Sequence, residues 1–274
     1  MKLKLEDFHK IVVLTGAGIS ADSGISTFRD SDGLWENHRI EDVATPEAFE
    51  RDPQLVWKFY SMRRLQAQKA IPNPAHFALV EFARKHPGKL TLVTQNVDGL
   101  HDRADENEYL PSLCMHGTLN QSRCTNCETV YFDDHAYFDL EGNYAPQETA
   151  ICTRTEKSRD TYLHHFNLSY KNFLPLSPCC QKPLRPHIVW FGEVPLYMDK
   201  IERALSQCDL FVSIGTSGKV YPAAGFLQFA KSLGAKTVIL NKEGIPQTPY
   251  VDREFLGRAK DTVPEFFKGE SEIS

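Results

Sequence analysis

The chain has 274 residues, of which 41% are hydrophobic and 24% are charged, and its net charge at pH 7 is −5. This is the composition of a globular protein with a large core, and the pI of about 6.1 argues against a general nucleic-acid binder. No stretch has the character of a signal peptide or a membrane span. Seven cysteines with a single Cys-x-x-Cys pair favour a metal site over a disulfide framework. We therefore expect a cytoplasmic protein that binds neither nucleic acid nor membrane.

A short β-branched run, Ile11–Thr15, predicts a buried parallel strand that ends in a glycine-rich turn. Gly16, Gly18 and Ala21 fit the relaxed Gly-x-Gly-x-x-Ala spacing at which backbone N–H groups approach a pyrophosphate. A tight turn without a ligand is the alternative for this pattern alone. Ser23-Gly24-Ile25 interrupts the helix that a dehydrogenase would continue towards a second strand and an acidic ribose ligand, so hydride transfer is disfavoured.

Strands and helices alternate along the remaining chain, which predicts an α/β fold with a parallel sheet. The expected helices are Glu47–Gln68, Ala75–Lys85 and Val220–Leu233. The expected strands are Leu90–Thr94, Arg185–Glu193, Leu210–Ser217 and Thr237–Leu240. Small or polar residues stand at three strand ends, in Gln95–His101, Gly215–Ser217 and Asn241. Ligands bind outside such strand ends, and these side chains suit ribose hydroxyls and a carboxamide. For the loop Gln95–His101 the alternative is a set of Asx turns.

Three further side chains are candidates for chemistry. His116 follows the candidate nucleotide site, which makes it a candidate general base, although a lone histidine is more often structural. Tyr60 and Arg63 are three residues apart and share one face of the expected helix. The alternative for that face is a half-buried tyrosine beside a solvated arginine.

Cys124 and Cys127 have the spacing of a zinc knuckle, but no matching pair follows at the usual distance. The stretch Glu128–Pro178 intervenes, and Cys179 and Cys180 then stand next to each other. Within the stretch, Cys152, His164 and His165 are further candidate ligands. The sequence predicts a zinc ion without identifying its full ligand set.

The motifs together resemble those of the sirtuin family, NAD-dependent protein-lysine deacylases. They occur in family order and span nearly the whole chain outside the stretch between the cysteine pairs. They are GAGISADSGISTFR at Gly16–Arg29, TQNVDGLH at Thr94–His101, HG at His116-Gly117, RPHIVWFGE at Arg185–Glu193 and GTS at Gly215–Ser217. The chain departs from the family pattern at Ser177, where the usual spacing would place a cysteine.

The resemblance implies a single catalytic domain over 1–274, with a Rossmann-like parallel-sheet large part and a small helical plus zinc-binding part. The large part would comprise 1–31, 76–119 and 185–274. The small part would comprise a helical module, 32–75, and a zinc module, 120–184. NAD would lie between the two parts as co-substrate, and one structural Zn²⁺ would be held by four protein ligands, which leave no open position.

The resemblance also assigns site residues. His116 would be the catalytic base acting on the ribose hydroxyls, together with Asn96. The residues implied in cofactor binding are Gly16, Ala17, Gly18, Ser20, Ala21, Phe28, Arg29, Gln95, Asn96, Val97, Asp98, Gly215, Thr216, Ser217, Asn241 and Ala259. A substrate peptide would add as a strand between the segments Val189–Glu193 and Gly218–Pro222, with Val189, Phe191, Gly192 and Glu193 as substrate-binding residues. The zinc ligands would be Cys124, Cys127, Cys179 and Cys180.

Tyr60, Arg63 and Ala44 match the residues that mark class III sirtuins, which remove succinyl, malonyl or glutaryl groups and also acetyl. An arginine fork and a phenol suit a terminal carboxylate. The partners implied are therefore acylated lysine side chains of proteins. Two alternatives stay open: a protein mono-ADP-ribosyltransferase that uses the same site, and a protein that binds NAD as a sensor without turnover. His116 and Asn96 argue against the sensor, which needs no base beside the ribose.

Overall fold

The computed structural model describes residues 3–26, 38–131, 174–244 and 249–269, and the backbone of several short strands outside these ranges. At its centre lies a six-stranded sheet in the order β17-β16-β15-β1-β4-β5, with every neighbouring pair parallel. Its strands are β1 (Ile11–Thr15), β4 (Leu90–Thr94), β5 (Ser112–Cys114), β15 (Leu210–Ile214), β16 (Lys236–Asn241) and β17 (Arg253–Leu256). The expected parallel α/β fold is confirmed.

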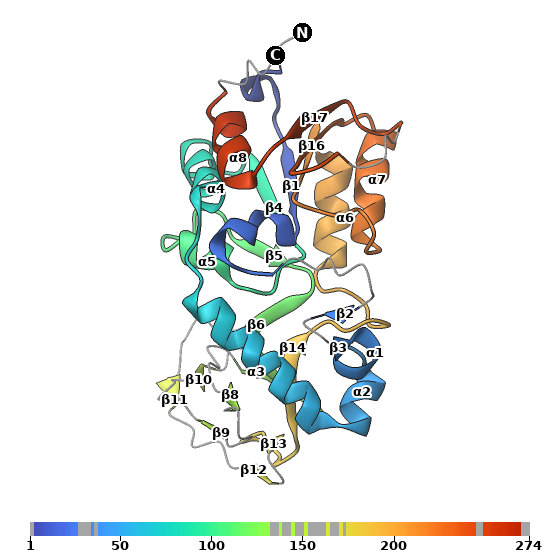
Figure 1. The fold of residues 1–274 in the computed structure, drawn as a ribbon. Helices are drawn as coiled ribbons and strands as arrows, with labels where there is room; N and C mark the ends of the chain where they lie inside the picture. Colours follow the sequence, from blue (N-terminus) through green and yellow to red (C-terminus); the bar gives the residue numbers. More distant parts are fainter. Residues whose placement is uncertain are drawn as a thin grey trace.

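Two pairs of helices cover the two faces of this sheet (Figure 1). On one face lie α4 (Pro74–Lys85) and α8 (Ala259–Lys268), which bury Leu79 and Phe266 against alternate residues of β1. On the other face lie α6 (Met198–Gln207) and α7 (Phe226–Ser232), which bury Leu205 and Phe226 against the remaining residues of β1. All five residues of β1 are buried, since helices cover both faces of the sheet. This burial explains why the sequence of the strand is a nearly continuous apolar run and does not alternate. The sheet order reverses direction at β1, so a crevice is expected at its carboxyl end, between β1 and β15.

The expected helix Glu47–Gln68 is two helices, α2 (Pro46–Arg51) and α3 (Pro53–Lys69). Asp52 ends the first and caps the second, because its side chain accepts from the N–H of Leu55. A proline fits the first turn of a helix, where no N–H is needed, so the chain restarts at Pro53. The expected helix Val220–Leu233 was also too long: a short 3₁₀ turn, Ala223–Gly225, precedes α7.

A second, three-stranded antiparallel sheet lies below the parallel one, in the order β14-β6-β7 (Figure 1). Its strands are β6 (Gly117–Cys124), β7 (Val130–Tyr131) and β14 (Leu184–Ile188). The prediction of a strand over Arg185–Glu193 was wrong at its end, because β14 stops at Ile188 and the chain turns. Helix α3 packs on this sheet through Trp57, which donates to the carbonyl of Leu184 at 2.9 Å.

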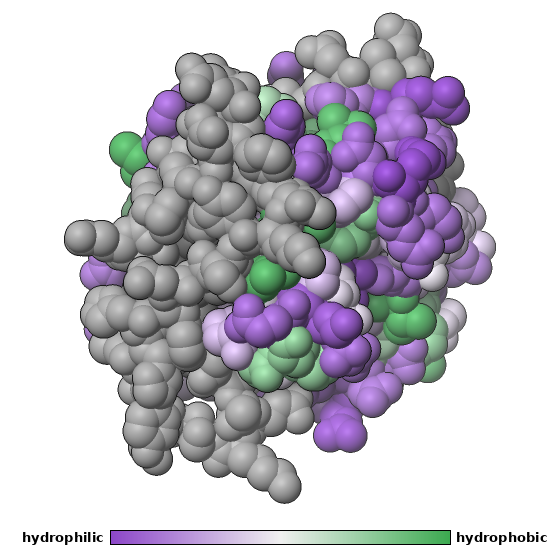
Figure 2. Space-filling model, turned by 90° about the horizontal axis from the view of Figure 1, so that it is seen from below, coloured by the Kyte–Doolittle hydropathy of each residue, from purple (hydrophilic) through white to green (hydrophobic). Residues whose placement is uncertain are grey.

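The remaining elements are short. They are the 3₁₀ turns η1 (Leu5–Asp7), η2 (Ala17–Ile19) and η3 (Ala21–Ser23), the helices α1 (Ile40–Val43) and α5 (Leu100–Ala104), and the strands β2 (Leu34–Trp35), β3 (His38–Arg39), β8 (Tyr137–Phe138), β9 (Tyr144–Ala145), β10 (Ile151–Cys152), β11 (Leu163–His164), β12 (Tyr170–Lys171) and β13 (Leu174–Pro175). Among the described residues, no helix has the length and apolar character to cross a bilayer. Seen from the end that carries α2 and α3, the described surface is mostly hydrophilic, with hydrophobic side chains in small separate groups (Figure 2).

Candidate active site and cysteine cluster

The chain leaves β1 through two 3₁₀ turns instead of a full helix, and this agrees with the interruption expected at Ser23-Gly24-Ile25. The N–H of Gly18 donates to the carbonyl oxygen of Gly215 at 2.9 Å, and that of Gly16 to the carbonyl oxygen of Ile214 at 3.0 Å. A Cβ on Gly18 would lie 2.6 Å from the Cα of Gly215, so only glycine allows this approach. The turn after β1 is therefore held against the end of β15.

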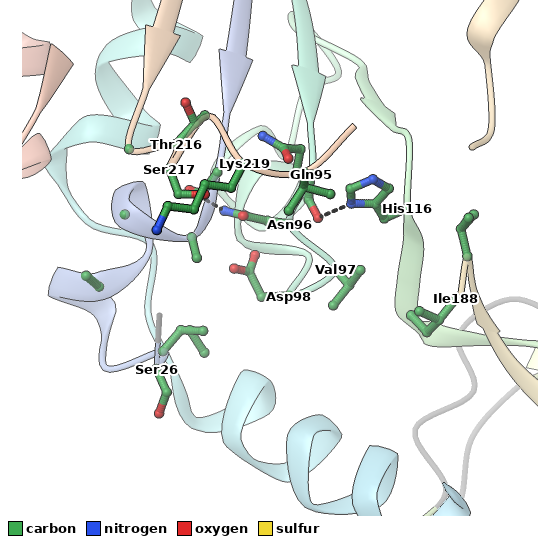
Figure 3. Close-up of a pocket in the computed structure, with 18 of the residues that line it drawn as sticks. Ser26, Gln95, Asn96, Val97, Asp98, His116, Ile188, Thr216, Ser217 and Lys219 are labelled. Atoms are coloured by element: carbon green, nitrogen blue, oxygen red, sulfur yellow. Dashed lines mark hydrogen bonds between the residues drawn. The ribbon is translucent and has the colours of Figure 1, made fainter. Parts of the chain in front are cut away.

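A cavity of about 1010 Å³ opens at the carboxyl ends of the parallel strands and continues towards α3. Ligand pockets in proteins reach roughly 300–1,000 Å³, so it is large enough for a dinucleotide together with part of a second substrate. Figure 3 shows Gln95, Asn96, Asp98 and His116 around one part of it, with Ser217 and Lys219 beside them. Its lining includes most of the predicted site residues: Gly16, Ala17, Gly18, Ala21, Ala44, Tyr60, Arg63, Gln95, Asn96, Val97, Asp98, His116, Val189, Phe191, Gly192, Glu193, Gly215, Thr216, Ser217, Asn241 and Ala259.

Three predicted cofactor residues are not on this lining. Ser20 is fully buried behind it, and its hydroxyl oxygen accepts from Nδ2 of Asn96 at 3.2 Å. Phe28 and Arg29 lie outside the described residues.

The side-chain amide nitrogen of Asn96 faces the glycine turn after β1 and is held there by two hydrogen bonds. Nδ2 donates to the carbonyl oxygen of Gly16 at 3.1 Å and to Ser20 Oγ at 3.2 Å, and the residue is only 9% exposed. A carbonyl oxygen can only accept, so Gly16 decides which end of the amide faces it. The Oδ1 atom of Asn96 is thereby left as the acceptor that can face a ligand.

His116 lies between β5 and β6, and its Nδ1 is 3.2 Å from the carbonyl oxygen of Gln95. Because that oxygen can only accept, Nδ1 carries the hydrogen and Nε2 keeps a lone pair for an incoming proton. Burial lowers the pKa of His116 below 6.5, against the opposing effect of the Gln95 hydrogen bond. The imidazole is therefore neutral at pH 7, as a general base must be.

The position after His116 requires a glycine, Gly117, for steric reasons. Its φ is +81°, and a Cβ there would lie 2.0 Å from the carbonyl oxygen of His187. Val189 in turn donates its N–H to the carbonyl of His116 at 2.9 Å. The close pairing of β6 with β14 thus positions the backbone of the histidine.

The far end of the cavity is formed by α3 and the segment after β14. Tyr60 is fully buried, and its hydroxyl oxygen accepts from Nε1 of Trp190 at 3.1 Å. Arg63 is 9% exposed and lies one turn further along α3, with its guanidinium carbon 5.8 Å from the centre of the Phe59 ring. Ala44 lines this end with a methyl group, and its carbonyl oxygen accepts from the N–H of Phe191 at 3.0 Å. A phenol and a guanidinium therefore face the cavity space bordered by a small residue.

The carboxylate of Glu193 is engaged within the protein. It forms two hydrogen bonds with Arg185, of 2.7 and 2.9 Å, and accepts from the N–H of Trp190 at 2.8 Å. Burial works against its ionisation, but these donors outweigh it, so the pKa of Glu193 lies below its usual range.

Sequence reasoning missed several lining residues, among them Ile40, Ile188, Trp190, Lys242 and Arg258. Trp190 stands inside a motif that was recognised, so its position was an available signal. Lys219 lies in the segment Gly218–Pro222, which was expected beside the substrate peptide, and its side chain extends along the cavity next to Ser217 (Figure 3). Arg258 lies near the chain end without a local signal, and its guanidinium pairs with Asp22.

Four cysteines from distant parts of the chain meet beside the antiparallel sheet. The Sγ atoms of Cys124, Cys127, Cys179 and Cys180 all lie within 4.8 Å of one another. A tetrahedral zinc ion with Zn–S bonds of about 2.3 Å has sulfur atoms roughly 3.8 Å apart, so the cluster could hold zinc. Ser177, which stands at the usual cysteine position, is buried, and its Oγ is 2.8 Å from Cys179 Sγ. The structure thus brings together the predicted ligand set, while the side chains of Cys152, His164 and His165 lie outside the described residues.

The parallel sheet, the glycine turn at its central strand and the polar residues at the strand ends define an α/β nucleotide-binding protein. The Sir2 family model matches residues 16–222. The chain belongs to the Sir2 family, which confirms the resemblance seen in its motifs.

Relatives and solved structures agree with this assignment. The chain is 45% identical over 259 residues to an NAD-dependent protein deacylase of Pasteurella multocida, covering 94% of this chain and 96% of that protein. It is 45% identical over 261 residues to an NAD-dependent protein deacylase of Escherichia coli strain K12, covering 94% and 80%. A Sir2 homolog–NAD complex has a TM-score of 0.75 at 33% identity, covering 99% and 93% of the chains. A Sir2–p53 peptide–NAD⁺ complex has a TM-score of 0.72 at 26% identity, covering 98% and 96%.

Proposed function

We propose that this protein is an NAD-dependent protein-lysine deacylase that prefers acyl groups ending in a carboxylate. The observation that carries the proposal is that one cavity joins Asn96 and His116 at one end to Tyr60 and Arg63 at the other. A cofactor and an acylated lysine could meet inside it. The relatives named as NAD-dependent protein deacylases support the reaction class.

NAD fits the cofactor end on the chemistry of its lining. The backbone turn at Gly16–Gly18 and the end of β15 suit a pyrophosphate, and the strand-end residues Ser217 and Asn241 suit ribose hydroxyls. The sirtuin complex with NAD supports this placement. When bound, NAD supplies an ADP-ribosyl group that receives the acyl group while nicotinamide leaves. Phe28 and Arg29 remain proposed contacts from the family motif alone.

His116 and Asn96 would carry the proton and orientation steps. With Nδ1 occupied by the carbonyl of Gln95, Nε2 of His116 can take a proton from a ribose hydroxyl. The fixed amide of Asn96 presents Oδ1 as an acceptor that orients a hydroxyl or a water molecule. Both side chains are held by backbone groups, so neither needs to reorganise for the reaction.

The end of the cavity that carries Tyr60 and Arg63, called the acyl end below, would bind the substrate's acyl group. Tyr60 is buried and its pKa is raised by that burial, so its hydroxyl stays protonated and can donate. A succinyl carboxylate could accept from this hydroxyl and from the fork of Arg63. The peptide would run as an added strand between Val189–Glu193 and Gly218–Pro222, and the sirtuin complex with a peptide supports protein substrates.

The cysteine cluster would hold one structural zinc ion. Four thiolate ligands fill a tetrahedral ion, so no position remains for a substrate. Because all described cysteines are free thiols and four of them form this cluster, we place the protein in the reducing cytoplasm. No contact with nucleic acid or membrane is part of the proposal.

We also propose the division into parts that the family resemblance implies. Every strand of the parallel sheet falls within 1–31, 76–119 and 185–274, the proposed large part. Helices α2 and α3 fall within 32–75, and Cys124, Cys127, Cys179 and Cys180 fall within 120–184. The cavity is lined by residues from both parts.

One experiment separates the proposal from its rivals. The protein is incubated with NAD and with peptides that carry succinyl-, malonyl- or acetyl-lysine, and the products are identified by mass spectrometry. Free nicotinamide together with O-acyl-ADP-ribose is the expected result. ADP-ribose attached to protein would instead indicate a mono-ADP-ribosyltransferase, and NAD binding without turnover would indicate a sensor. Faster turnover of acetyl- than of succinyl-lysine would contradict the acyl preference.

A further inference from the structure

An ion pair with little exposure lies beside the acyl end of the cavity, formed by Arg185 and by Glu193, which lines the cavity. Nη1 of Arg185 donates to Oε1 of Glu193 at 2.7 Å, and Nη2 donates to Oε2 at 2.9 Å. Their side chains are 8% and 23% exposed. A bidentate pair of this kind holds both partners in one relative geometry.

Both members of the pair contact Trp190. The guanidinium carbon of Arg185 lies 3.4 Å from the centroid of the Trp190 ring, and Oε2 of Glu193 accepts the Trp190 backbone N–H at 2.8 Å. Nη2 of Arg185 also donates to the carbonyl oxygen of Ile188 at 2.8 Å, at the end of β14. The ion pair thus holds the backbone of Trp190 on one side and the plane of its indole on the other.

Trp190 in turn contacts Tyr60 from α3, 130 residues away in sequence. Its Nε1 donates to the Tyr60 hydroxyl oxygen at 3.1 Å, and the ring centroids are 6.5 Å apart. Both side chains are almost completely buried. A donor fixed on the hydroxyl oxygen restricts the directions in which that hydroxyl can donate its own hydrogen.

We propose that Arg185 and Glu193 are positioning residues for acyl selectivity, which hold Trp190 and through it the hydroxyl of Tyr60. The inference rests on the proposed function, in which Tyr60 and Arg63 bind a carboxylate-terminated acyl group. Pairing with Arg185 has a second effect, because Glu193 lines the same cavity. A carboxylate without its cation would repel an acidic acyl group there.

The test is the ratio of kcat/KM for a succinyl-lysine peptide to that for the matched acetyl-lysine peptide. We expect Glu193→Gln and Arg185→Lys each to lower this ratio about tenfold, mainly through KM of the succinyl peptide. Arg123→Gln is the matched control, since Arg123 reaches Oε1 of the same Glu193 at 3.5 Å from β6. Its ratio should stay within about twofold of the unaltered protein. An equal loss for both peptides would assign the ion pair to folding alone and would overturn the proposal.

A double-substitution cycle tests whether the pair acts through the indole. Trp190→Phe keeps an aromatic ring but removes the donor to Tyr60, so it should lower the ratio by itself. Adding Glu193→Gln to it should then have little further effect, because the two changes interrupt one connection. Additive losses would mean that Glu193 contacts the substrate directly, which contradicts the positioning role.

A spectroscopic measurement separates this proposal from the proposed function. The chain has three tryptophans, so ¹⁹F NMR of the fully 5-fluorotryptophan-labelled protein gives few signals, and Trp190→Phe identifies that of Trp190. Glu193→Gln should shift the Trp190 signal more than the others, and an unmoved signal would overturn the proposal whatever the activity. If Tyr60→Phe leaves the succinyl-to-acetyl ratio unchanged, the acyl assignment fails, while the Trp190 signal still reports on the ion pair.

Discussion

The backbones of Gly18 and Gly215 touch where two strands of the parallel sheet end. The N–H of Gly18 donates to the carbonyl oxygen of Gly215, and a Cβ on Gly215 would lie 2.5 Å from the backbone nitrogen of Ile19. The contact joins the turn after β1 to the turn after β15, and both turns line the cavity. Neither residue can carry a side chain without moving the turn opposite it.

Gly215→Ala should therefore lower the free energy of unfolding by about 1–3 kcal/mol beyond the cost of its positive φ, because the collision is with backbone. Gly234→Ala is the control, since Gly234 also has a positive φ, of +94°, but no atom within 4 Å of the added Cβ. That substitution should cost only about 1–2 kcal/mol. Urea denaturation measures the free energy of unfolding of both variants, and equal losses in Gly215→Ala and Gly234→Ala would contradict the steric explanation.

His116→Ala should lower kcat for deacylation at least about 100-fold, the range in which a general base contributes. NAD should still bind, because the glycine turn and Asn96 are unaltered, and calorimetric titration with NAD is the control. Full activity at saturating NAD would remove His116 from the mechanism.

The pH dependence follows from the lowered pKa of His116. A base acts when deprotonated, so the rate should be level near pH 7 and decline only as the pH falls through a value below 6.5. A decline that begins above 6.5 would show that another group controls the rate.

Acid should destabilise the fold through His76, which packs against His101 with ring centroids 4.8 Å apart. Burial lowers the pKa of His76 to about 4. Between pH 6.5 and 4 the unfolded chain binds a proton that the folded chain excludes, so stability is full above pH 6.5 and falls as the pH falls. His76→Gln should flatten the dependence of Tm on pH over this window, and an unchanged slope would contradict the assignment.

Purified protein should contain one zinc ion per chain by metal analysis. Cys124→Ser should remove most of it and lower Tm, because three thiolates hold the ion less tightly and the cluster joins β6 to the segment before β14. Cys114→Ser is the control, since Cys114 lies on β5 outside the cluster. Unchanged zinc content in Cys124→Ser would refute the site.

Arg63→Met should lower the ratio of succinyl to acetyl kcat/KM at least tenfold, since hydrogen bonds to charged groups contribute roughly 1.5–3 kcal/mol each. Arg63→Lys keeps the charge without the planar fork and should give an intermediate ratio. Peptides that differ only in the acyl group provide the comparison. If kcat/KM falls equally for the succinyl and the acetyl peptide, Arg63 stabilises α3 and does not bind the acyl group.

Local patterns were sufficient for the core of the fold. Ile11–Thr15 and Leu90–Thr94 were predicted with the observed bounds, because a buried parallel strand is a continuous apolar run. Where a strand or helix was drawn too long, the reason was partly local. Pro53 marks a helix start that the periodicity of its neighbours concealed.

The end of β14 has a different cause. Its apolar pattern continues past Ile188, and the strand ends there because the Trp190 N–H is taken by the side chain of Glu193 instead of a neighbouring strand. No periodicity in the sequence records such a contact.

By itself the sequence determined the parallel sheet, the glycine turn, the polar strand ends and the family, since each depends on residues that are neighbours in the chain. Only the tertiary structure decided that Cys179 and Cys180 meet Cys124 and Cys127 across a long intervening stretch. It also decided that Glu193 turns to Arg185, and that Trp190 reaches Tyr60. These contacts join residues far apart in sequence or side chains with several possible partners, and burial together with hydrogen-bond geometry selects one of them.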